Sequence, residues 1–548
     1  MYVDKMALLG TPAVTAIAIA GFILFVTRLL AARKAVRKLE AAKAPMPKHH
    51  PIFGHLAALK ESIQGLPRDC TMHVVIKNIS KRFPNGVFYM DLWPFSRTLM
   101  VITSHTAATQ VENAFLDKPA SVTAPLEILT AGPSLITMHG GAWKKWRGLF
   151  NPGFSAGYMI GLAPAIADEV AVFCRLLQDQ AKQSSTFQLE EYTLRLTFDI
   201  ITHVALDSRI HYQTAPHLLP QALRNQILWT SFGTTFNPVR RYLSPRPFVH
   251  WWNSRKINRY LAEEVGARFE EQRQDFKKPQ GDQRRSKSVL SLALNKYLQE
   301  EGDRGEASKI TFIENAIPQL RAFLFAGHDT TSSTLQFCFF VLSKYPEVLG
   351  RIRVELDQVF STDSSIDKVH DVIEANPQLL NQIPYTFAVI KEVLRLYPPA
   401  GALREGRAGF VVADEEGHRY PTEGCNVWIL PLAIHHNPKI FVKPDEFIPE
   451  RWTVGPEDPL YPPKGAWRVF EWGPRACIGQ TLALLELRVA LVMTTRLFDI
   501  KPAYEEWDEM HPPKGEKMVD GERCYQCEKG GGTSHPSDGF PCKVTLRT

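Results

Sequence analysis

The sequence predicts a mostly α-helical protein with small β-sheets, preceded by a single N-terminal transmembrane helix. Three observations support this prediction: apolar residues recur at helical spacing over long stretches, strand-like runs are confined to two zones, and an uncharged apolar segment stands near the N-terminus. The chain has 548 residues, of which 45% are hydrophobic and 22% are charged. This composition excludes a disordered chain and a polytopic membrane protein.

The N-terminal segment from Ala7 to Thr27 carries no charge and is long enough to cross a bilayer as a helix. A cleavable signal peptide is the alternative, but its apolar part is usually shorter and is followed by small residues. Here basic residues follow instead: Arg28, Arg33, Lys34, Arg37 and Lys38. This flank favours an uncleaved anchor with the rest of the chain in the cytosol. Much of the net charge of +7 lies in this cluster, so a membrane is expected as a partner and nucleic acid is not.

We expect three segments along the chain: a membrane anchor at 1–30, a basic linker with a Pro-rich hinge at 31–51, and one folded domain at 52–548. Within the domain, no repeat of fixed period is found. The expected helices cover residues 158–183, 188–206, 254–275, 311–344 and 480–497, the expected strands lie near 87–92, 99–103 and 427–430, and the polar stretch 277–287 is expected to be an exposed loop.

The eight cysteines are too sparse for a disulfide framework, which favours a reducing compartment. Cys524 and Cys527 form a Cys-x-x-Cys pair, with His535 and Cys542 downstream, so a zinc site has to be considered. No second paired spacing exists. A β-hairpin with incidental thiols is the simpler interpretation.

The most specific motif is Phe470-Glu-Trp-Gly473-Pro-Arg475-Ala-Cys477-Ile-Gly479, which directly precedes an apolar helical pattern. A cysteine just before a helix suits a thiolate, because free amide groups and the positive end of the helix dipole stabilise the anion. The two glycines let the backbone bend around a bulky planar cofactor. The arginine supplies a cation and the phenylalanine restricts solvent at the sulfur. A buried core cysteine is the ordinary alternative.

This motif resembles the heme-binding signature of the cytochrome P450 family. The resemblance implies the cytochrome P450 fold and heme b (iron protoporphyrin IX) as cofactor, with Cys477 as the axial thiolate and metal ligand. It also implies that Phe470, Gly473, Arg475 and Gly479 belong to the cofactor-binding loop. The thiolate would push electron density toward iron and so favour cleavage of the O–O bond.

A Glu-x-x-Arg pair, Glu392 and Arg395, occupies one face of an expected helix that Pro398 and Pro399 would end. Most such pairs are solvated surface pairs. The resemblance implies instead that Arg451 joins them in a buried structural network that supports the heme pocket. Losing one member would leave a buried charge unpaired.

A polar cluster interrupts the long apolar helical pattern at Ala326-Gly-His328-Asp329-Thr330-Thr331. It resembles the oxygen-activation motif of the family, in which Gly327 permits a distorted helix. The resemblance implies that Thr330 hydrogen-bonds oxygen or a water at the iron and that Asp329 relays protons. The alternative is that the threonines bond back to the preceding helical turn. No role is assigned to His328.

Trp143 and Arg147 are four residues apart and resemble the family's Trp-x-x-x-Arg helix, whose side chains would donate to a heme propionate. Trp146 has the wrong spacing to the arginine. A further propionate donor is expected after Pro399, where Arg404 is the better candidate and Arg407 the weaker.

The resemblance therefore implies a membrane-anchored monooxygenase that inserts one oxygen atom from O2 into an apolar organic substrate. No flavin or nicotinamide motif is found, so a separate NADPH-cytochrome P450 reductase would supply electrons, with cytochrome b5 as an optional second donor. The expected location is the endoplasmic reticulum membrane, with the catalytic domain in the cytosol. Candidate contacts for the reductase are Lys144, Lys145, Lys464 and Arg468.

The substrate is less defined. The segments expected to line the pocket are mostly apolar or small, which favours an apolar substrate: 126–135, 323–326, 400–403 and 529–533. The C-terminal sequence and the anchor resemble fungal members that oxidise polyketides and other secondary metabolites, including mycotoxin intermediates. Three alternatives remain: a fatty-acid or xenobiotic hydroxylase, a reductase-independent heme-thiolate isomerase, and a non-catalytic heme-binding sensor. The acid–threonine pair argues against the last two.

Overall fold

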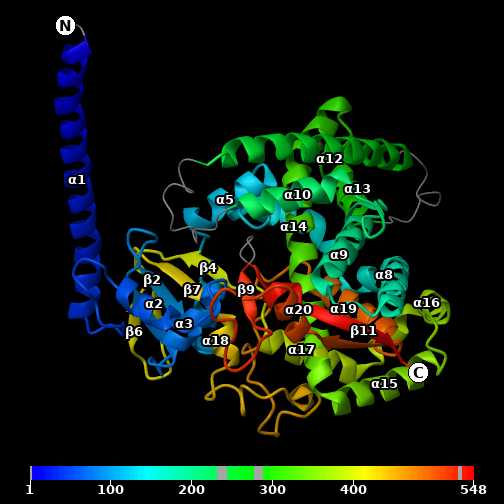
Figure 1. Ribbon diagram of the computed structural model, residues 1–548. Coiled ribbons are helices and arrows are strands. Elements are labelled where there is room, and N and C mark those ends of the chain that lie inside the picture. Colours follow the sequence, from blue (N-terminus) through cyan, green and yellow to red (C-terminus); the bar gives the residue numbers. More distant parts are fainter. Residues whose placement is uncertain (1–2, 231–243, 277–287, 529–532, 548) are drawn as a thin grey trace.

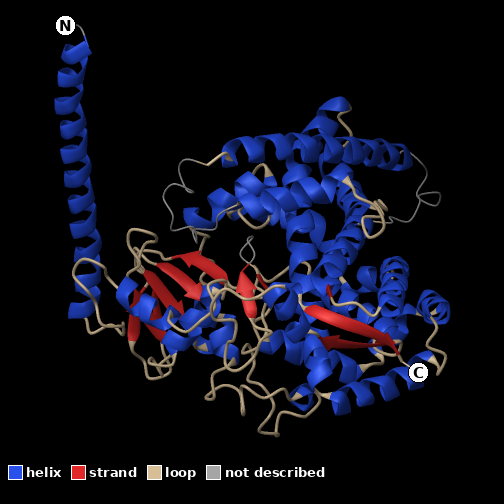
Figure 2. Cartoon of the chain, in the orientation of Figure 1, coloured by secondary structure: helices blue, strands red, loops and turns tan. Residues whose placement is uncertain are grey.

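The structure is a computed structural model that describes residues 3–230, 244–276, 288–528 and 533–547, with side chains described from residue 15 onward. The expected fold class is confirmed: a mostly helical body carries small sheets, and one long helix projects from it (Figures 1 and 2). The loop expected at 277–287 lies outside the described residues, as do residues 529–532 of the expected pocket lining.

The projecting helix, α1 (Val3–Ala41), runs without a break through the expected anchor and most of the expected linker. Its part from Thr15 onward is long and apolar enough to cross a membrane, and its most apolar window has no residue buried in the body. Among the described residues, α1 is the one helix that meets this criterion. Near its C-terminal end, however, Arg33 and Val36 are buried against the body.

The body is built around α14 (Glu306–Lys344), which crosses its centre and packs closely on α9 (Leu189–Leu206) (Figure 1). α10 (Leu218–Trp229) and α12 (Arg246–Phe276) pack on each other at one end of α14. The helices predicted from periodicity are present, although α8 (Ala163–Gln183) begins later than expected. Pro164 lacks an amide hydrogen and fits only the first turn of a helix, which explains that start.

The remaining helices frame this centre. Their bounds are α2 (Leu56–Ile63), α3 (Met72–Ser80), α4 (His105–Asn113), α5 (Ala120–Thr130), α6 (Gly140–Phe150), α7 (Ala156–Ile160), α13 (Val289–Glu301), α15 (Pro346–Phe360), α16 (Ile366–Ala375), α17 (Pro384–Leu396), α18 (Pro431–His435), α19 (Gln480–Thr494) and α20 (Tyr504–Met510).

The largest sheet has the strand order β1-β2-β7-β4 and lies to one side of the helical centre (Figure 2). Its strands β1 (Val87–Met90), β2 (Leu99–Ile102) and β7 (Asn426–Ile429) match the three strand-like runs in the sequence, while β4 (Ala402–Glu405) carries Arg404. The smaller sheets are β3-β11-β8, β5-β6 and the hairpin β9-β10. Their strands are β3 (Phe187–Gln188), β5 (Val411–Ala413), β6 (Arg419–Pro421), β8 (Phe498–Pro502), β9 (Gln526–Glu528), β10 (Ser534–Pro536) and β11 (Pro541–Leu546).

Candidate functional site

Cys477 ends a closed loop immediately before α19. The Cys477 amide donates to the Phe470 carbonyl at 2.8 Å, which closes the loop from 470 to 477. Gly473 has a φ of +76°, a conformation that favours glycine. The backbone conformation therefore explains why glycine stands at this position of the motif. Gly479 is the N-cap of α19. The loop therefore holds the sulfur at the positive end of a helix.

The electrostatic surroundings of the Cys477 thiol act in both directions. Desolvation raises its pKa, while the backbone amides of Gly479 and Gln480 and the cations of Arg147 and Lys118 act to lower it. The side chain is accessible to solvent, unlike every other cysteine except the partly buried Cys70. An accessible sulfur facing two amides and two cations is suited to bind a metal as its thiolate.

Two of the predicted propionate donors, Trp143 and Arg147, lie beside this loop, close to Arg475 of the loop itself. Trp143 is buried on α6, the guanidinium of Arg475 stacks on its ring at 4.5 Å, and that of Arg147 lies 6.0 Å from the same ring. Trp146 instead packs on Phe150 and Phe312 in the hydrophobic core. The structure thus places Trp143, and not Trp146, at the candidate site.

Arg404 reaches the same place from β4, where it is buried and its guanidinium lies 3.3 Å from the Glu471 carboxylate. Arg407 is exposed and points elsewhere, toward the Ala114 carbonyl. The sequence reasoning missed a further cation, Lys118. Desolvation and the charges of Arg404 and Arg475 lower the pKa of Lys118 to about 7. No local pattern marks this lysine, because its neighbours come from distant parts of the chain.

These residues fit an iron porphyrin with a cysteine ligand. Glu471 and Asp117 lie 3.3 and 3.9 Å from Arg404 and Arg475, and the two carboxylates of heme would add anionic partners for this group of cations. Among the described residues, the Nε of Arg475 is buried without a hydrogen-bond partner, and a buried donor of this kind is costly unless a ligand accepts from it. Arg147, Arg404 and Arg475 would hold the propionates and Cys477 the iron.

On α14, Thr330 and Asp329 make different contacts from those that the resemblance implies. The Thr330 hydroxyl donates to the Ala326 carbonyl at 2.9 Å, as the alternative interpretation expected. Ala326 is exposed, whereas residues 316–325 before it on α14 are buried. Both Asp329 oxygens are engaged by residues of the C-terminal hairpin: Oδ1 lies 3.3 Å from His535, and Oδ2 accepts from Thr533.

Packing between helices, and not the expected helix distortion, explains the glycine at position 327. α14 is continuous here, and a Cβ atom on Gly327 would lie 2.9 Å from Cγ1 of Ile201 on α9. The glycine therefore permits the close approach of two helices. His328 is also structural: it is buried, its Nδ1 lies 2.6 Å from the Leu324 carbonyl of its own helix, and desolvation lowers its pKa.

The predicted structural network is present and fully buried. Glu392 accepts from Arg395 at 2.8 and 2.9 Å, from Arg451 at 3.0 Å and from the Trp452 indole at 2.9 Å. The arginines also donate to backbone carbonyls between residues 435 and 446. One carboxylate thus holds two buried cations and joins α17 to the loop that follows α18.

A buried histidine, His435, connects this network to the cysteine loop. The Arg468 amide donates to its Nε2 at 3.0 Å, and its Nδ1 lies 2.9 Å from the Arg395 carbonyl. Desolvation holds its pKa well below the usual value, so the ring is neutral and the Nδ1 hydrogen is donated to the carbonyl. No periodic pattern or motif in the sequence marks this link.

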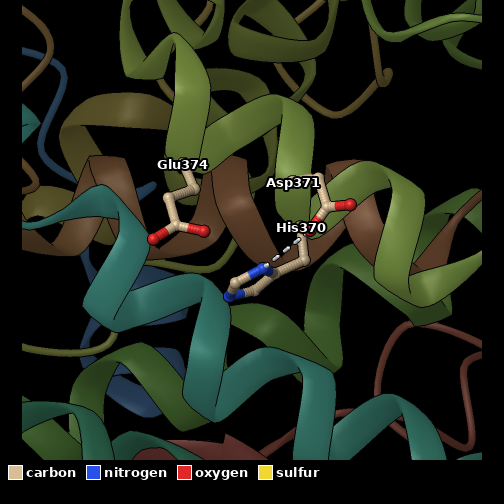
Figure 3. Close-up of side chains that lie close together, drawn as sticks. All are labelled: His370, Asp371 and Glu374. Carbon is tan, nitrogen blue, oxygen red and sulfur yellow. Dashed lines mark ion pairs between the residues drawn. The ribbon is translucent and has the colours of Figure 1, made fainter.

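The zinc alternative is not supported by the described residues. Cys527 lies opposite His535 in the β9-β10 hairpin, but both ring nitrogens of His535 face carboxylates. Two other groups of possible ligands lie largely at the surface: His370, Asp371 and Glu374 on α16 (Figure 3), and Asp414, Glu416 and His418. His370 already pairs with Asp168 at 2.7 Å. His370 and His418 thus already face carboxylates in ion pairs.

The fold and the cysteine loop define a heme-thiolate protein. The cytochrome P450 family profile matches residues 44–524, so the chain belongs to this family and is a cytochrome P450 monooxygenase. It is 38% identical to cytochrome P450 monooxygenase polC of Polytolypa hystricis, over 95% of this chain and 93% of that protein.

Two further comparisons agree. The chain is 31% identical to cytochrome P450 monooxygenase acrF of Aspergillus aculeatus, over 87% of this chain and 98% of that protein. Among solved structures, the heme domain of cytochrome P450DA superposes with a TM-score of 0.69, at 21% identity over 92% of this chain and 98% of that chain. This last match supports the fold.

Proposed function

We propose that the enzyme inserts one oxygen atom from O2 into an apolar organic substrate of fungal secondary metabolism, with electrons from a separate NADPH-dependent reductase. The observation that carries the proposal is the arrangement at Cys477, where the cysteine loop and the stacked Trp143 and Arg475 occur together. Thr330 lies on α14, which packs against α19, the helix that follows this loop. The fungal monooxygenases polC and acrF, similar over most of their length, support the substrate class.

Each set of residues has a separate task. Heme, when bound, supplies the activation of O2. Cys477 would hold the iron, and Arg147, Arg404 and Arg475 would fix the orientation of the ring through its propionates. Thr330 would present its hydroxyl as a proton donor, and Asp329 would supply protons to it. In the structure the Thr330 hydroxyl donates a hydrogen bond to the Ala326 carbonyl. The hydroxyl must therefore rotate before it can donate a proton in the reaction.

The residues expected to line the substrate pocket support an apolar ligand. Ala326 is exposed next to buried Phe323 on α14, and Leu126, Leu129 and Leu135 are buried in and after α5, which packs against α14. Apolar side chains around a few polar groups are typical of pockets for apolar small molecules. A fatty acid or a foreign apolar compound is the second candidate on the same ground.

Fewer residues are candidates for contact with the reductase than the sequence predicts. Arg468 is a wrong candidate, because it is buried and pairs with Glu112, Thr109 and the His105 carbonyl. Lys144 and Lys464 are exposed, and exposed Lys145 lies 2.6 Å from Glu301. These three lysines are the remaining candidates for attracting an acidic partner.

Attachment to the endoplasmic reticulum membrane is supported by two apolar surfaces. α1 carries the exposed apolar span, and α12 lies at the end of the body toward which α1 extends (Figure 1). At the start of α12, Phe248, Trp251 and Trp252 are 63%, 51% and 50% exposed, with cations of Arg255 and Lys256 over the tryptophan rings. Tryptophan and basic residues together favour a membrane–water interface.

The test of the proposal uses the full-length holoenzyme and Cys477→Ser. The wild type should give a reduced carbon monoxide spectrum of the thiolate type and should consume NADPH only when the reductase is added. The Cys477→Ser variant should lose the thiolate-type spectrum, because a serine oxygen does not donate electron density to iron as a thiolate sulfur does. A variant that retains this spectrum, or a wild type that works without reductase, contradicts the proposal.

A further inference from the structure

The buried end of the β9-β10 hairpin carries a histidine held between two carboxylates. His535 Nε2 lies 3.3 Å from Asp329 Oδ1 on α14, and its Nδ1 lies 3.1 Å from Glu190 Oε1 on α9. Thr533, two residues earlier, donates to Asp329 Oδ2 and lies 3.0 Å from His535 Nε2. All four residues are buried. Three separate parts of the chain thus meet at one charged cluster.

The cluster favours the charged form of each partner. Desolvation opposes charge on His535, but Asp329 and Glu190 outweigh it and raise the pKa of His535 to about 10. Desolvation likewise opposes charge on Asp329, and the His535 cation lowers the pKa of that carboxyl well below its usual range. Removing one member of a buried ion pair leaves an uncompensated charge. His535 is therefore the group that keeps Asp329 ionised.

The other titratable groups described around His535 do not supply a positive charge in its place. On α14, His328 is neutral because desolvation lowers its pKa. From α3, His73 lies 3.4 Å from the neighbouring Ser534, and desolvation lowers its pKa to about 4. In β9, Cys527 is opposite His535 in register and carries no charge of its own as a thiol. Among these groups His535 is the one cation.

We propose that His535 is the positioning residue for Asp329: its imidazolium holds the Asp329 carboxylate charged and turned away from Thr330, so that the C-terminal hairpin controls delivery of protons to the site. This inference rests on the proposed role of Asp329 as a proton relay. The two carboxylate oxygens are bound to the hairpin, and the Thr330 hydroxyl is bound to Ala326. Release of Asp329 from the hairpin is the step that His535 governs.

The proton supply decides between two balanced reactions. In productive turnover, NADPH + H⁺ + O2 + RH gives NADP⁺ + ROH + H2O. When proton delivery is mistimed, NADPH + H⁺ + O2 gives NADP⁺ + H2O2. The ratio of peroxide to NADPH therefore reports on Asp329 directly, whereas a merely structural histidine would change only the amount of folded enzyme.

The first arm of the experiment tests the charge cluster without turnover. Melting temperatures of wild-type, His535→Gln and His535→Lys holoenzymes are compared at pH 7 and pH 10. A pKa raised from 6.5 to about 10 stabilises the fold fully below pH 6.5, and this contribution is lost as the pH rises to about 10. The gap between wild type and His535→Gln should therefore shrink at pH 10. His535→Lys should not show this loss, since lysine stays charged over that range.

The second arm measures peroxide per NADPH with the reductase. The probe is whichever of dodecanoic acid, farnesol and progesterone gives the largest spin-state shift. His535→Gln should lower product per NADPH about tenfold, and its peroxide fraction should become pH-dependent, because without the imidazolium desolvation raises the pKa of Asp329. His535→Lys should restore the flat profile. Cys527→Ser, a change at the opposite position of the hairpin, should match wild type.

Cumene hydroperoxide brings its oxygen already reduced, so oxidation of the same probe with it should be equal in wild type and His535→Gln. An unchanged peroxide fraction in His535→Gln, together with the expected melting behaviour, would mean that the histidine is structural and would overturn the inference alone. If the wild type consumes no NADPH with the reductase, the proposed function fails, and the inference fails with it.

Discussion

At the scale of single residues, Thr330 has two interpretations: a proton donor in the reaction, or a threonine that only bonds back to its own helix. Its hydroxyl bonds back to Ala326 at 2.9 Å, and the same kind of bond recurs one turn later, from Thr334 to the Thr330 carbonyl at 2.9 Å. A back-bond of this type is an ordinary feature of threonine in helices. The two threonines differ in their exposure: Thr330 is partly exposed and Thr334 is buried.

Replacing Thr330 by Ala should raise the peroxide formed per NADPH severalfold and leave heme content unchanged, because a proton donor is lost while the ligand loop is untouched. Peroxide and product assays of the reconstituted enzyme measure this. Thr334→Ala removes an equivalent helical back-bond and serves as the matched control. Equal uncoupling in both variants would assign the effect to the helix backbone and would contradict a proton-delivery role for Thr330.

At the scale of elements, the buried Glu392 network joins α17 to the segment between α18 and the cysteine loop. The carboxylate is the single anion between Arg395 and Arg451 among the contacts described. His435, which bonds to the Arg395 carbonyl, accepts from the Arg468 amide, nine residues before Cys477. The position of the thiolate therefore depends on ion pairs that are distant from it in sequence.

Glu392→Gln should destabilise the holoenzyme by about 3 kcal/mol or more, because two buried guanidinium groups lose their counter-charge. Denaturant unfolding, followed by the heme spectrum, measures the loss. Asp179→Asn is the control: Asp179 forms an exposed pair with Lys182 at 2.9 Å, and such pairs contribute less than about 1 kcal/mol. Similar losses in the two variants would show that the network is no more important than a surface pair.

At the scale of the whole molecule, the anchor is continuous with the body. Arg33 on α1 is buried, pairs with Asp91 and donates to the Pro51 carbonyl at 3.0 Å. His49 lies 3.1 Å from the same Asp91 carboxylate. The C-terminal part of α1 therefore belongs structurally to the domain, although the sequence pattern assigns it to a linker.

Removing residues 2–29 should release the enzyme from membranes and preserve its melting temperature, because Arg33 remains. Removing residues 2–40 should lower the melting temperature by several degrees, since Asp91 loses its buried partner. Arg33→Met in the shorter form separates the charge from the helix and should reproduce most of this loss. Two truncated forms that melt at the same temperature would contradict the role of the ion pair.

The sequence by itself determined the helical class, the anchor, the thiolate motif and most candidate residues, because each depends on periodicity or on a short contiguous pattern. Cys477, Glu392 and Arg395 are recognisable within windows of a few residues. The sequence already favoured Arg404 over Arg407 as a propionate donor. The tertiary structure alone decided that Arg468 is buried and that Lys118 and His535 take part. These residues meet partners hundreds of positions away, and pairing across such distances follows from how helices and strands pack.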